Sequence, residues 1–190
     1  RWMVYGEIMQ NLKTLQDEGL VRALGISNAS VEEIAIAEQV LGAGNLVSVQ
    51  NQFSPRYPGS FGELQYCDAH GIAFLPWSPL GGGMLAGILE KPGTGRRTQE
   101  WVQKKLGKHR EAVAAYEAFC KELGTPPADV ALAWTLIHPA ITSPIIGPRT
   151  VDQLTGALRV LELHLDEAVL KRLDGIWPGP GGPAPEAYSW

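Results

Sequence analysis

Short apolar segments with strand character alternate four times with helical segments along this chain of 190 residues. The predicted strands are 21–26, 46–50, 72–77 and 142–146, and each is followed by a helical segment, directly or after a loop. Such alternation is typical of parallel strands joined by crossover helices, because a parallel pair needs a long connection back to the same end of the sheet. The sequence therefore predicts an α/β fold.

Capping motifs mark where several of the helices begin. Ser30-x-x-Glu33, Ser60-x-x-Glu63 and Thr150-x-x-Gln153 each match a capping box. Between the third strand and the next helix lies the Gly-rich and basic stretch 78–108, which is too long for a plain connector and is predicted to be functional or disordered. The other predicted helices are 1–18, 109–123, 129–137 and one that begins at Asp166, and the Pro/Gly-rich tail 177–190 is predicted to be irregular.

The composition excludes several classes of function. With 16 basic and 20 acidic side chains the formal net charge is −4, which argues against an electrostatic nucleic-acid footprint. No apolar run approaches the ~20 residues that span a bilayer. Cys67 and Cys120 stand in no metal or redox spacing, so a reducing, cytoplasmic location is expected. The four histidines lie on or beside predicted helices without a second ligand nearby, so no metal site is expected.

Polar residues follow the predicted strands where each strand ends. Ser27 and Asn28 follow the first strand, Gln50 ends the second, and Trp77 ends the third. In parallel α/β folds these carboxyl ends are where ligands bind. Amide and hydroxyl groups could hold a ligand amide, and an aromatic ring could stack on a planar group, although each residue alone also fits an ordinary loop.

Two further segments are suited to phosphate. The glycines after Ser78 allow backbone N–H groups to approach a phosphate closely, and Arg149 stands beside a predicted helix N-terminus, which favours anions. No G-x-G-x-x-G opens any helix, which argues against a Rossmann fold. The chain has no G-x-S-x-G elbow and no carboxylate pair placed for acid/base chemistry.

Taken together, four motifs resemble the C-terminal half of an aldo-keto reductase. They are Gly19-x-Val21-Arg22-x-x-Gly25-Ile26-Ser27-Asn28, Val49-Gln50-Asn51, Trp77-Ser78-Pro79-Leu80, and Ile146-Gly147-Pro148-Arg149-x-x-x-Gln153. The resemblance implies a (β/α)8 TIM-type barrel that binds NADPH across its C-terminal mouth. Residues 1–176 would then hold the last four parallel strands with their helices, 78–108 would cover the cofactor, and 177–190 would be the tail.

The same resemblance assigns roles to individual residues. It implies that Ser27, Asn28 and Gln50 hold the nicotinamide carboxamide and that Trp77 stacks on the nicotinamide ring. The pyrophosphate loop would be lined by Ser78, Leu80, Gly83 and Leu85, and the adenosine end would meet Gly147, Arg149 and Gln153, with Arg149 beside the 2′-phosphate of NADP.

The chain also departs from the family pattern. The family's catalytic Asp, Tyr, Lys and His belong to the first four strands, which would precede Arg1, and no tyrosine here matches the proton-donor motif. Gly156 and Ala157 replace a usual Glu and Asn, and Ile88 replaces a usual Lys. The expected function is therefore an NADPH-dependent reductase of a small carbonyl substrate whose catalytic half lies outside this chain, so that the chain alone is inactive.

Two alternatives remain open from the sequence. One is a nucleotide-binding half-barrel or pseudoenzyme that serves as an interaction module, and the other is an unrelated phosphate-binding α/β enzyme. Four parallel strands cannot close a barrel, so inward-facing residues such as Val21, Val49 and Phe74 are expected to lie uncovered. We therefore expect a missing N-terminal half, or a second copy of the chain, as partner.

Overall fold

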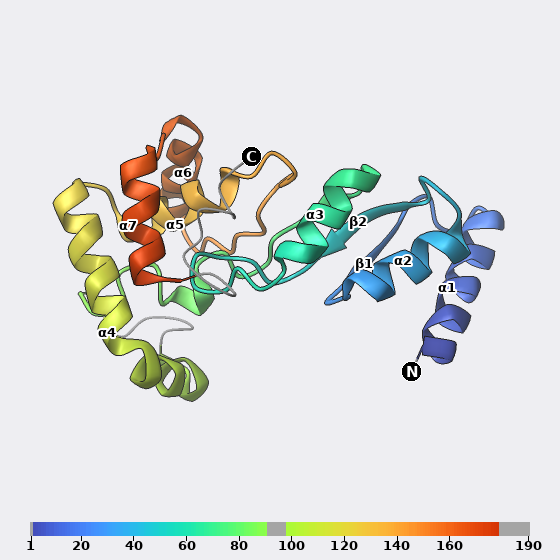
Figure 1. Ribbon diagram of the computed structural model, residues 1–190, viewed down its shortest axis with the longest axis horizontal. Coiled ribbons are helices and arrows are strands. Elements are labelled where there is room, and N and C mark those ends of the chain that lie inside the picture. Colours follow the sequence, from blue (N-terminus) through green and yellow to red (C-terminus); the bar gives the residue numbers. More distant parts are fainter. Residues whose placement is uncertain (1, 91–97, 179–190) are drawn as a thin grey trace.

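The computed structural model describes residues 2–90 and 98–178, and Figure 1 shows them as an elongated arrangement with α1 near one end and α4 near the other. The predicted tail beyond residue 178, and residues 91–97 of the predicted loop, lie outside this range. The elements in chain order are α1 (Trp2–Asp17), β1 (Leu24–Ser27), α2 (Val31–Leu41), β2 (Leu46–Gln50), α3 (Phe61–His70), β3 (Ala73–Phe74), η1 (Gly81–Gly83), α4 (Glu100–Leu123), α5 (Pro127–Leu136), α6 (Val151–Leu158), η3 (Arg159–Glu162) and α7 (Glu167–Ile176).

The sheet is parallel and its strands follow the chain in the order β1-β2-β3. The predicted fourth strand is present only as two isolated parallel bridges, in which Ile141 pairs with Phe74 and Ile145 with Trp77. Pro76 and Pro144 supply no N–H to a ladder, so the pairing is interrupted there. The predicted parallel α/β arrangement is confirmed, with shorter strands at this edge.

The capping predictions have mixed outcomes. Ser30 forms the full capping box with Glu33, and the Thr150 hydroxyl accepts a bond from the N–H of Gln153. The box predicted at Ser60 is wrong: the Ser60 side chain makes no cap hydrogen bond. Its backbone angles of φ −89° and ψ 26° lie outside the extended region that a capping side chain needs.

The long loop predicted between the third strand and the next helix is shorter than expected. Helix α4 begins at Glu100, and the predicted start at His109 is instead a kink with φ −121° and ψ 16°. Val102 and Leu106 are 0% and 6% exposed, so this first part of α4 buries an apolar stripe of its own. Burial against the rest of the chain therefore explains why residues 100–108 are helical, although their basic composition predicts a loop.

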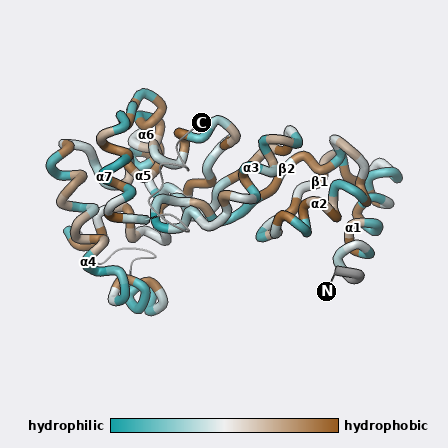
Figure 2. Tube along the Cα trace, viewed as in Figure 1, coloured by the Kyte–Doolittle hydropathy of each residue, from teal (hydrophilic) through white to brown (hydrophobic). Residues whose placement is uncertain are grey.

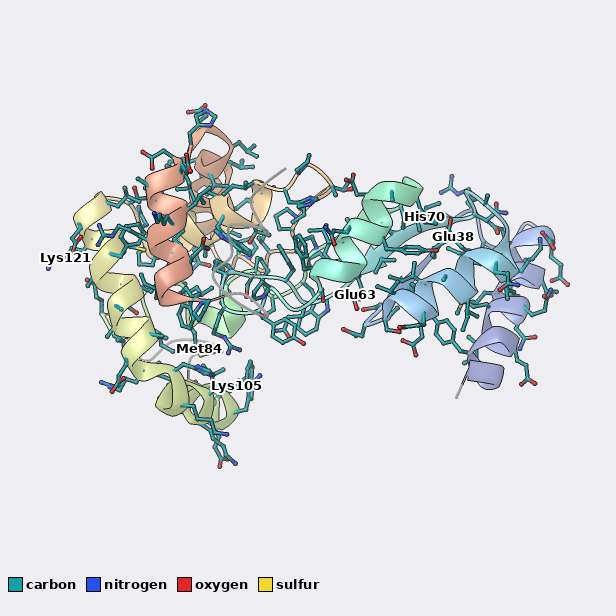
Figure 3. The ribbon with its side chains drawn as sticks, viewed as in Figure 1. Glu38, Glu63, His70, Met84, Lys105 and Lys121 are labelled. Atoms are coloured by element: carbon teal, nitrogen blue, oxygen red, sulfur yellow. The ribbon has the colours of Figure 1, made fainter. Side chains whose placement is uncertain are left out.

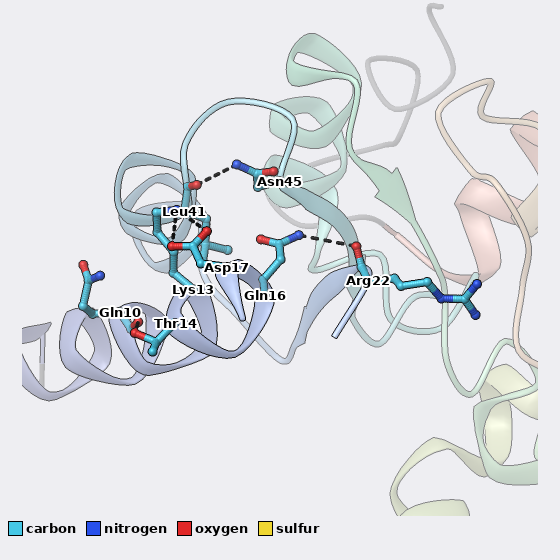
Figure 4. A network of polar contacts seen from close by, with 8 residues as sticks. All are labelled: Gln10, Lys13, Thr14, Gln16, Asp17, Arg22, Leu41 and Asn45. Atoms are coloured by element: carbon cyan, nitrogen blue, oxygen red, sulfur yellow. Dashed lines mark hydrogen bonds and ion pairs between the residues drawn. The ribbon is translucent and has the colours of Figure 1, made fainter. Parts of the chain in front are cut away.

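Local side-chain bonds fix the approach to β1 and β2 (Figure 4). The amide of Gln16 donates to the carbonyl oxygen of Arg22 at 3.5 Å, beyond the end of α1. After α2, the Asn45 amide donates to the carbonyl oxygen of Leu41 at 2.8 Å and closes the turn that leads into β2. Both contacts precede the strands, at the end of the sheet opposite to the carboxyl ends.

One hydrophobic cluster runs through most of the described structure, and hydrophobic and hydrophilic positions alternate along the helices (Figure 2). Val49 and Phe74 are 0% exposed within this cluster and Val21 packs against it, so the expectation that they lie uncovered is wrong. They share the cluster with residues of the helices, which cover them. The exposed apolar residues are instead Val47 on β2 and Ile145 at the isolated bridge to Trp77, at 43% and 41%.

The first residue of the predicted tail is irregular, as expected, and packs against the rest of the chain. Trp177 is 8% exposed and belongs to the same hydrophobic cluster, so the packed part of the chain extends at least one residue beyond α7. No helix within residues 2–90 or 98–178 combines the length and apolar character that crossing a bilayer takes.

Candidate functional site

The carboxyl ends of β1, β2 and β3 bring four of the predicted site residues together. The Ser27 hydroxyl and the Asn28 N–H both donate to the carbonyl oxygen of Gln50, at 2.8 and 3.1 Å. The indole N–H of Trp77 donates to Oδ1 of Asn28 at 3.0 Å. Hydrogen bonds therefore connect three strand ends that are far apart in the sequence.

The backbone is strained at this edge. Asn28 and Ser78 both have φ 56°, and they are the only non-glycine residues in the described structure with positive φ. Left-handed backbone costs an ordinary residue ~1–3 kcal/mol and persists where the surroundings hold it. Its concentration at the two predicted binding segments fits a site that requires a fixed side-chain direction.

Asn51 is a site residue to which the sequence analysis gave no role. It is 4% exposed, and its carboxamide accepts from the N–H of Ala29 at 3.1 Å and donates to the carbonyl oxygen of Ala29 at 2.8 Å. Asn51 thereby ties the end of β2 to the segment that carries Asn28. The available signal was its place beside Gln50, but the partner lies 22 positions away in the sequence.

The glycine-rich segment after Trp77 folds back on itself. The N–H groups of Gly81 and Gly83 donate to the carbonyl oxygens of Ser78 and Leu80, and the N–H of Gly82 donates to the Ser78 hydroxyl at 3.1 Å. The N–H of Leu85 also donates to the carbonyl oxygen of Leu80. These four N–H groups are therefore occupied within the turn.

The predicted pyrophosphate residues differ in accessibility. Leu85 is 0% exposed and packs in the hydrophobic core, whereas Ser78, Leu80 and Gly83 are half-buried. A ligand at this turn could therefore contact Ser78, Leu80 and Gly83, whereas the Leu85 side chain is inaccessible to it.

The predicted adenosine-end residues lie at the N-terminus of α6. Gly147, Arg149 and Gln153 are exposed, and the Gln153 side chain accepts from the backbone N–H of Arg149 at 2.7 Å. Among the described residues no carboxylate forms an ion pair with Arg149. The bridge between Trp77 and Ile145 places the segment that leads to these residues beside the third strand end. The segment that leads to the predicted adenosine-end residues therefore lies beside Trp77 of the predicted nicotinamide end.

The hydrogen bonds that join the three strand ends are made by hydroxyl, indole, amide and carbonyl groups. None of the hydrogen bonds of Ser27, Asn28 or Trp77 involves a tyrosine, lysine or carboxylate. Tyr116 is buried, and its hydroxyl donates to the carbonyl oxygen of Pro127 at 2.6 Å while burial raises its pKa well above the usual value, which marks a structural role. No cluster of three or more potential metal ligands occurs within residues 2–90 and 98–178.

Comparisons with known proteins identify a family. The model of the Aldo/keto reductase family matches residues 1–178. The chain is 39% identical over 193 residues to the uncharacterized oxidoreductase YrpG of Bacillus subtilis, covering 98% of this chain and 58% of YrpG. It is 32% identical over 161 residues to a 6-dehydroglucose reductase of Novosphingobium aromaticivorans, covering 83% of this chain and 47% of that protein.

A solved structure gives the same picture of the fold. The glycerol dehydrogenase of Gluconobacter oxydans superposes with a TM-score of 0.72 at 24% identity, over 90% of this chain and 54% of that one. The chain thus spans about half the length of the relatives that it matches.

Proposed function

The chain belongs to the aldo/keto reductase family, and from this premise we propose that it forms the cofactor-binding half of an NADPH-dependent carbonyl reductase. The family consists of oxidoreductases with an α/β TIM-barrel fold, and its members generally use nicotinamide cofactors. The choice of NADP, the reduction of a small carbonyl compound and the cytoplasmic location are our proposals for this chain.

We propose that residues 1–176 contribute the last four strands of the barrel. The parallel order β1-β2-β3, continued by the bridges to Ile141 and Ile145, supports this assignment. Intact barrels of this type have ~250 residues. The family's Asp, Tyr, Lys and His would then be provided by the other four strands.

The meeting of Asn28, Gln50 and Trp77 at the strand ends carries the proposal. The Gln50 carboxamide is half-buried and makes no hydrogen bond with a described residue, so it can both donate to and accept from a ligand amide. Because Trp77 binds Oδ1 of Asn28, the amide N–H groups of Asn28 are directed elsewhere and can also donate. These groups fit the carboxamide of nicotinamide.

We assign the remaining site residues to successive parts of the cofactor. The Trp77 ring would lie against the nicotinamide, while Ser78, Leu80, Gly83 and the backbone of Leu85 would border the pyrophosphate. Gly147, Arg149 and Gln153 would hold the adenosine end, with the Arg149 guanidinium beside the 2′-phosphate. When bound, the nicotinamide supplies the hydride for carbonyl reduction, and the residues of this chain bind and orient it.

Titration calorimetry of NADPH into the 190-residue chain tests this function. We expect binding, and we expect Gln50→Ala to weaken it about tenfold through the loss of two carboxamide hydrogen bonds. Gln10→Ala, an exposed change on α1, is the matched control and should leave binding unchanged. Absence of NADPH binding by the unaltered chain would contradict the proposal.

A second candidate is a nucleotide-binding half-barrel without redox chemistry. The lack of a tyrosine, lysine or carboxylate among the side-chain partners of Ser27, Asn28 and Trp77 favours it for the chain on its own. In either case we expect no useful aldehyde reduction by the isolated chain, since a general acid typically contributes ~10²–10⁴-fold. Steady oxidation of NADPH in the presence of a simple aldehyde would overturn this expectation.

We further propose that a second half-barrel, from an N-terminal half or from another copy of the chain, covers the open side of the sheet. Among the described residues β1 pairs only with β2, and Val47 and Ile145 remain exposed on the strands. Open strand edges and exposed apolar residues favour association. Size-exclusion chromatography with light scattering tests this, and a monodisperse monomer that unfolds cooperatively would contradict it.

A further inference from the structure

Arg56 occupies a fixed turn beside the candidate site. The turn is closed by two backbone bonds between Ser54 and Tyr57, at 2.8 and 3.2 Å, and Ser54 is 0% exposed. Just before it, the N–H of Phe53 donates to the carbonyl oxygen of Trp77 at 3.4 Å. The backbone of Arg56 is thus held against the segment that follows β3.

The side chain of Arg56 approaches the glycine-rich turn Gly81–Gly83. A Cβ atom built on Gly81 would stand 3.5 Å from Nε of Arg56. That Nε is buried and has no hydrogen-bond partner, and no described carboxylate forms an ion pair with the guanidinium. Burial lowers the pKa of Arg56, although an arginine keeps its charge at neutral pH. A partly desolvated cation without an anion is costly, which points to a ligand that supplies the negative charge.

The turn itself does not offer free backbone donors. The N–H groups of all three of its glycines already donate within the segment, to Ser78 and Leu80. An anion placed over the turn must therefore be neutralised by side chains, and Arg56 is the side chain whose buried nitrogen approaches it.

Further positive charge lies near the same turn. Burial, and then the charges of Arg56, Lys108 and Lys105, lower the pKa of His109 at the kink of α4. Lys105 lies over the ring of Trp101, with Nζ 5.3 Å from the centroid. The Trp101 ring packs on Gly82, where an added Cβ would come within 2.7 Å of it. Figure 3 shows Lys105 on the same side of the molecule as Met84, the residue after the turn.

We propose that Arg56 is a diphosphate-binding residue whose guanidinium pairs with the bridging diphosphate of the dinucleotide at the Gly81–Gly83 turn. This inference rests on the proposed cofactor function, and it adds a residue that follows β2 to a subsite otherwise formed by the segment after β3. Lys105 and Lys108 extend the positive field around the same turn.

The test measures how inorganic pyrophosphate and NADP⁺ shift the thermal unfolding of the full 190-residue chain. We expect pyrophosphate to raise the melting temperature of the unaltered chain, and Arg56→Met to abolish that shift and to weaken NADP⁺ binding about tenfold. Arg110→Ala is the matched control, because it removes an exposed cation next to His109 in the sequence. Arg110 is not among the charges that lower the pKa of His109. This variant should retain the shift.

A ligand-free measurement distinguishes binding from a structural role. If Arg56 serves a ligand, Arg56→Met should raise the melting temperature of the free chain, since it removes a partly desolvated charge that has no anionic partner among the described residues. A fall in that temperature, a pyrophosphate shift that survives in Arg56→Met, or no shift in the unaltered chain would each overturn the inference. A shift from pyrophosphate without any NADP⁺ binding would support the anion site and contradict the proposed cofactor function.

Discussion

Replacing Asn51 with alanine should destabilise the chain more than any change of an exposed site residue. The Asn51 side chain satisfies both backbone groups of Ala29, and both residues are 4% exposed. Truncation would leave one buried N–H and one buried C=O without a partner, at ~1–3 kcal/mol each. Because water can enter part of the vacated space, we expect Asn51→Ala to lower the free energy of unfolding by about 2–4 kcal/mol.

Urea denaturation followed by circular dichroism measures this effect, with the slope m compared between variants. Asn45→Ala is the matched control: its amide makes a single bond, to the carbonyl oxygen of Leu41, in a half-buried turn. It should cost only ~0.5–1.5 kcal/mol. Equal midpoints for the two variants would refute the view that Asn51 is a buried link between β2 and the Asn28 segment.

Three further outcomes are expected. Arg149→Ala should narrow the preference for NADPH over NADH about tenfold in binding assays, through loss of a charge-assisted phosphate contact, and equal binding of both nucleotides by the unaltered chain would contradict this. Gly82→Ala should lower the unfolding free energy by ~1–3 kcal/mol in urea, since its φ is +72° and its Cβ would meet Trp101; Gly87→Ala, with φ +76° and open space, should show the strain alone. Burial lowers the pKa of His138 in the folded chain, with the charge of Asp68 opposing the shift, so protonation favours unfolding. Stability should therefore fall as the pH drops below ~6.5, and His138→Gln should reduce that fall between pH 7.5 and 5 in parallel urea titrations.

Local signals predicted the helix starts best. The capping box at Ser30 and the cap at Thr150 depend on residues three positions apart, so the sequence contains both partners. The start of α4 could not be found in this way. Its first turns are rich in polar and basic residues, and they are held by the burial of Val102 and Leu106 against segments that are distant in the chain.

The site shows the same division. Strand-end position was enough to predict that Asn28, Gln50 and Trp77 meet, because parallel strands share one carboxyl edge. Asn51 and Arg56 were missed because their surroundings are tertiary. The partner of Asn51, Ala29, follows the neighbouring strand β1 and is 22 positions away in the sequence. The approach of Arg56 to Gly81 depends on how the turn at Ser54–Tyr57 packs in the folded chain.

The hydrogen bond from Trp77 to Asn28 offers a test of how the site is organised. The indole N–H lies 3.0 Å from Oδ1 of an exposed asparagine, so the bond should add under ~1 kcal/mol to stability. Under the proposed function, its larger effect is to direct the Asn28 amide toward the nicotinamide. Trp77→Phe removes this donor and keeps a smaller aromatic ring for stacking, so NADP⁺ binding should weaken severalfold while the unfolding midpoint changes little.

A double-mutant cycle with Asn28→Ala completes this test, with NADP⁺ binding measured by calorimetry because Trp77 is itself a fluorophore. If Trp77 acts through Asn28, then removing the indole N–H from the Asn28→Ala variant should cause little further loss. The two effects would then overlap by about 0.5–1.5 kcal/mol. Full additivity would show that the two side chains meet the ligand independently, and the 3.0 Å contact would then be incidental to binding.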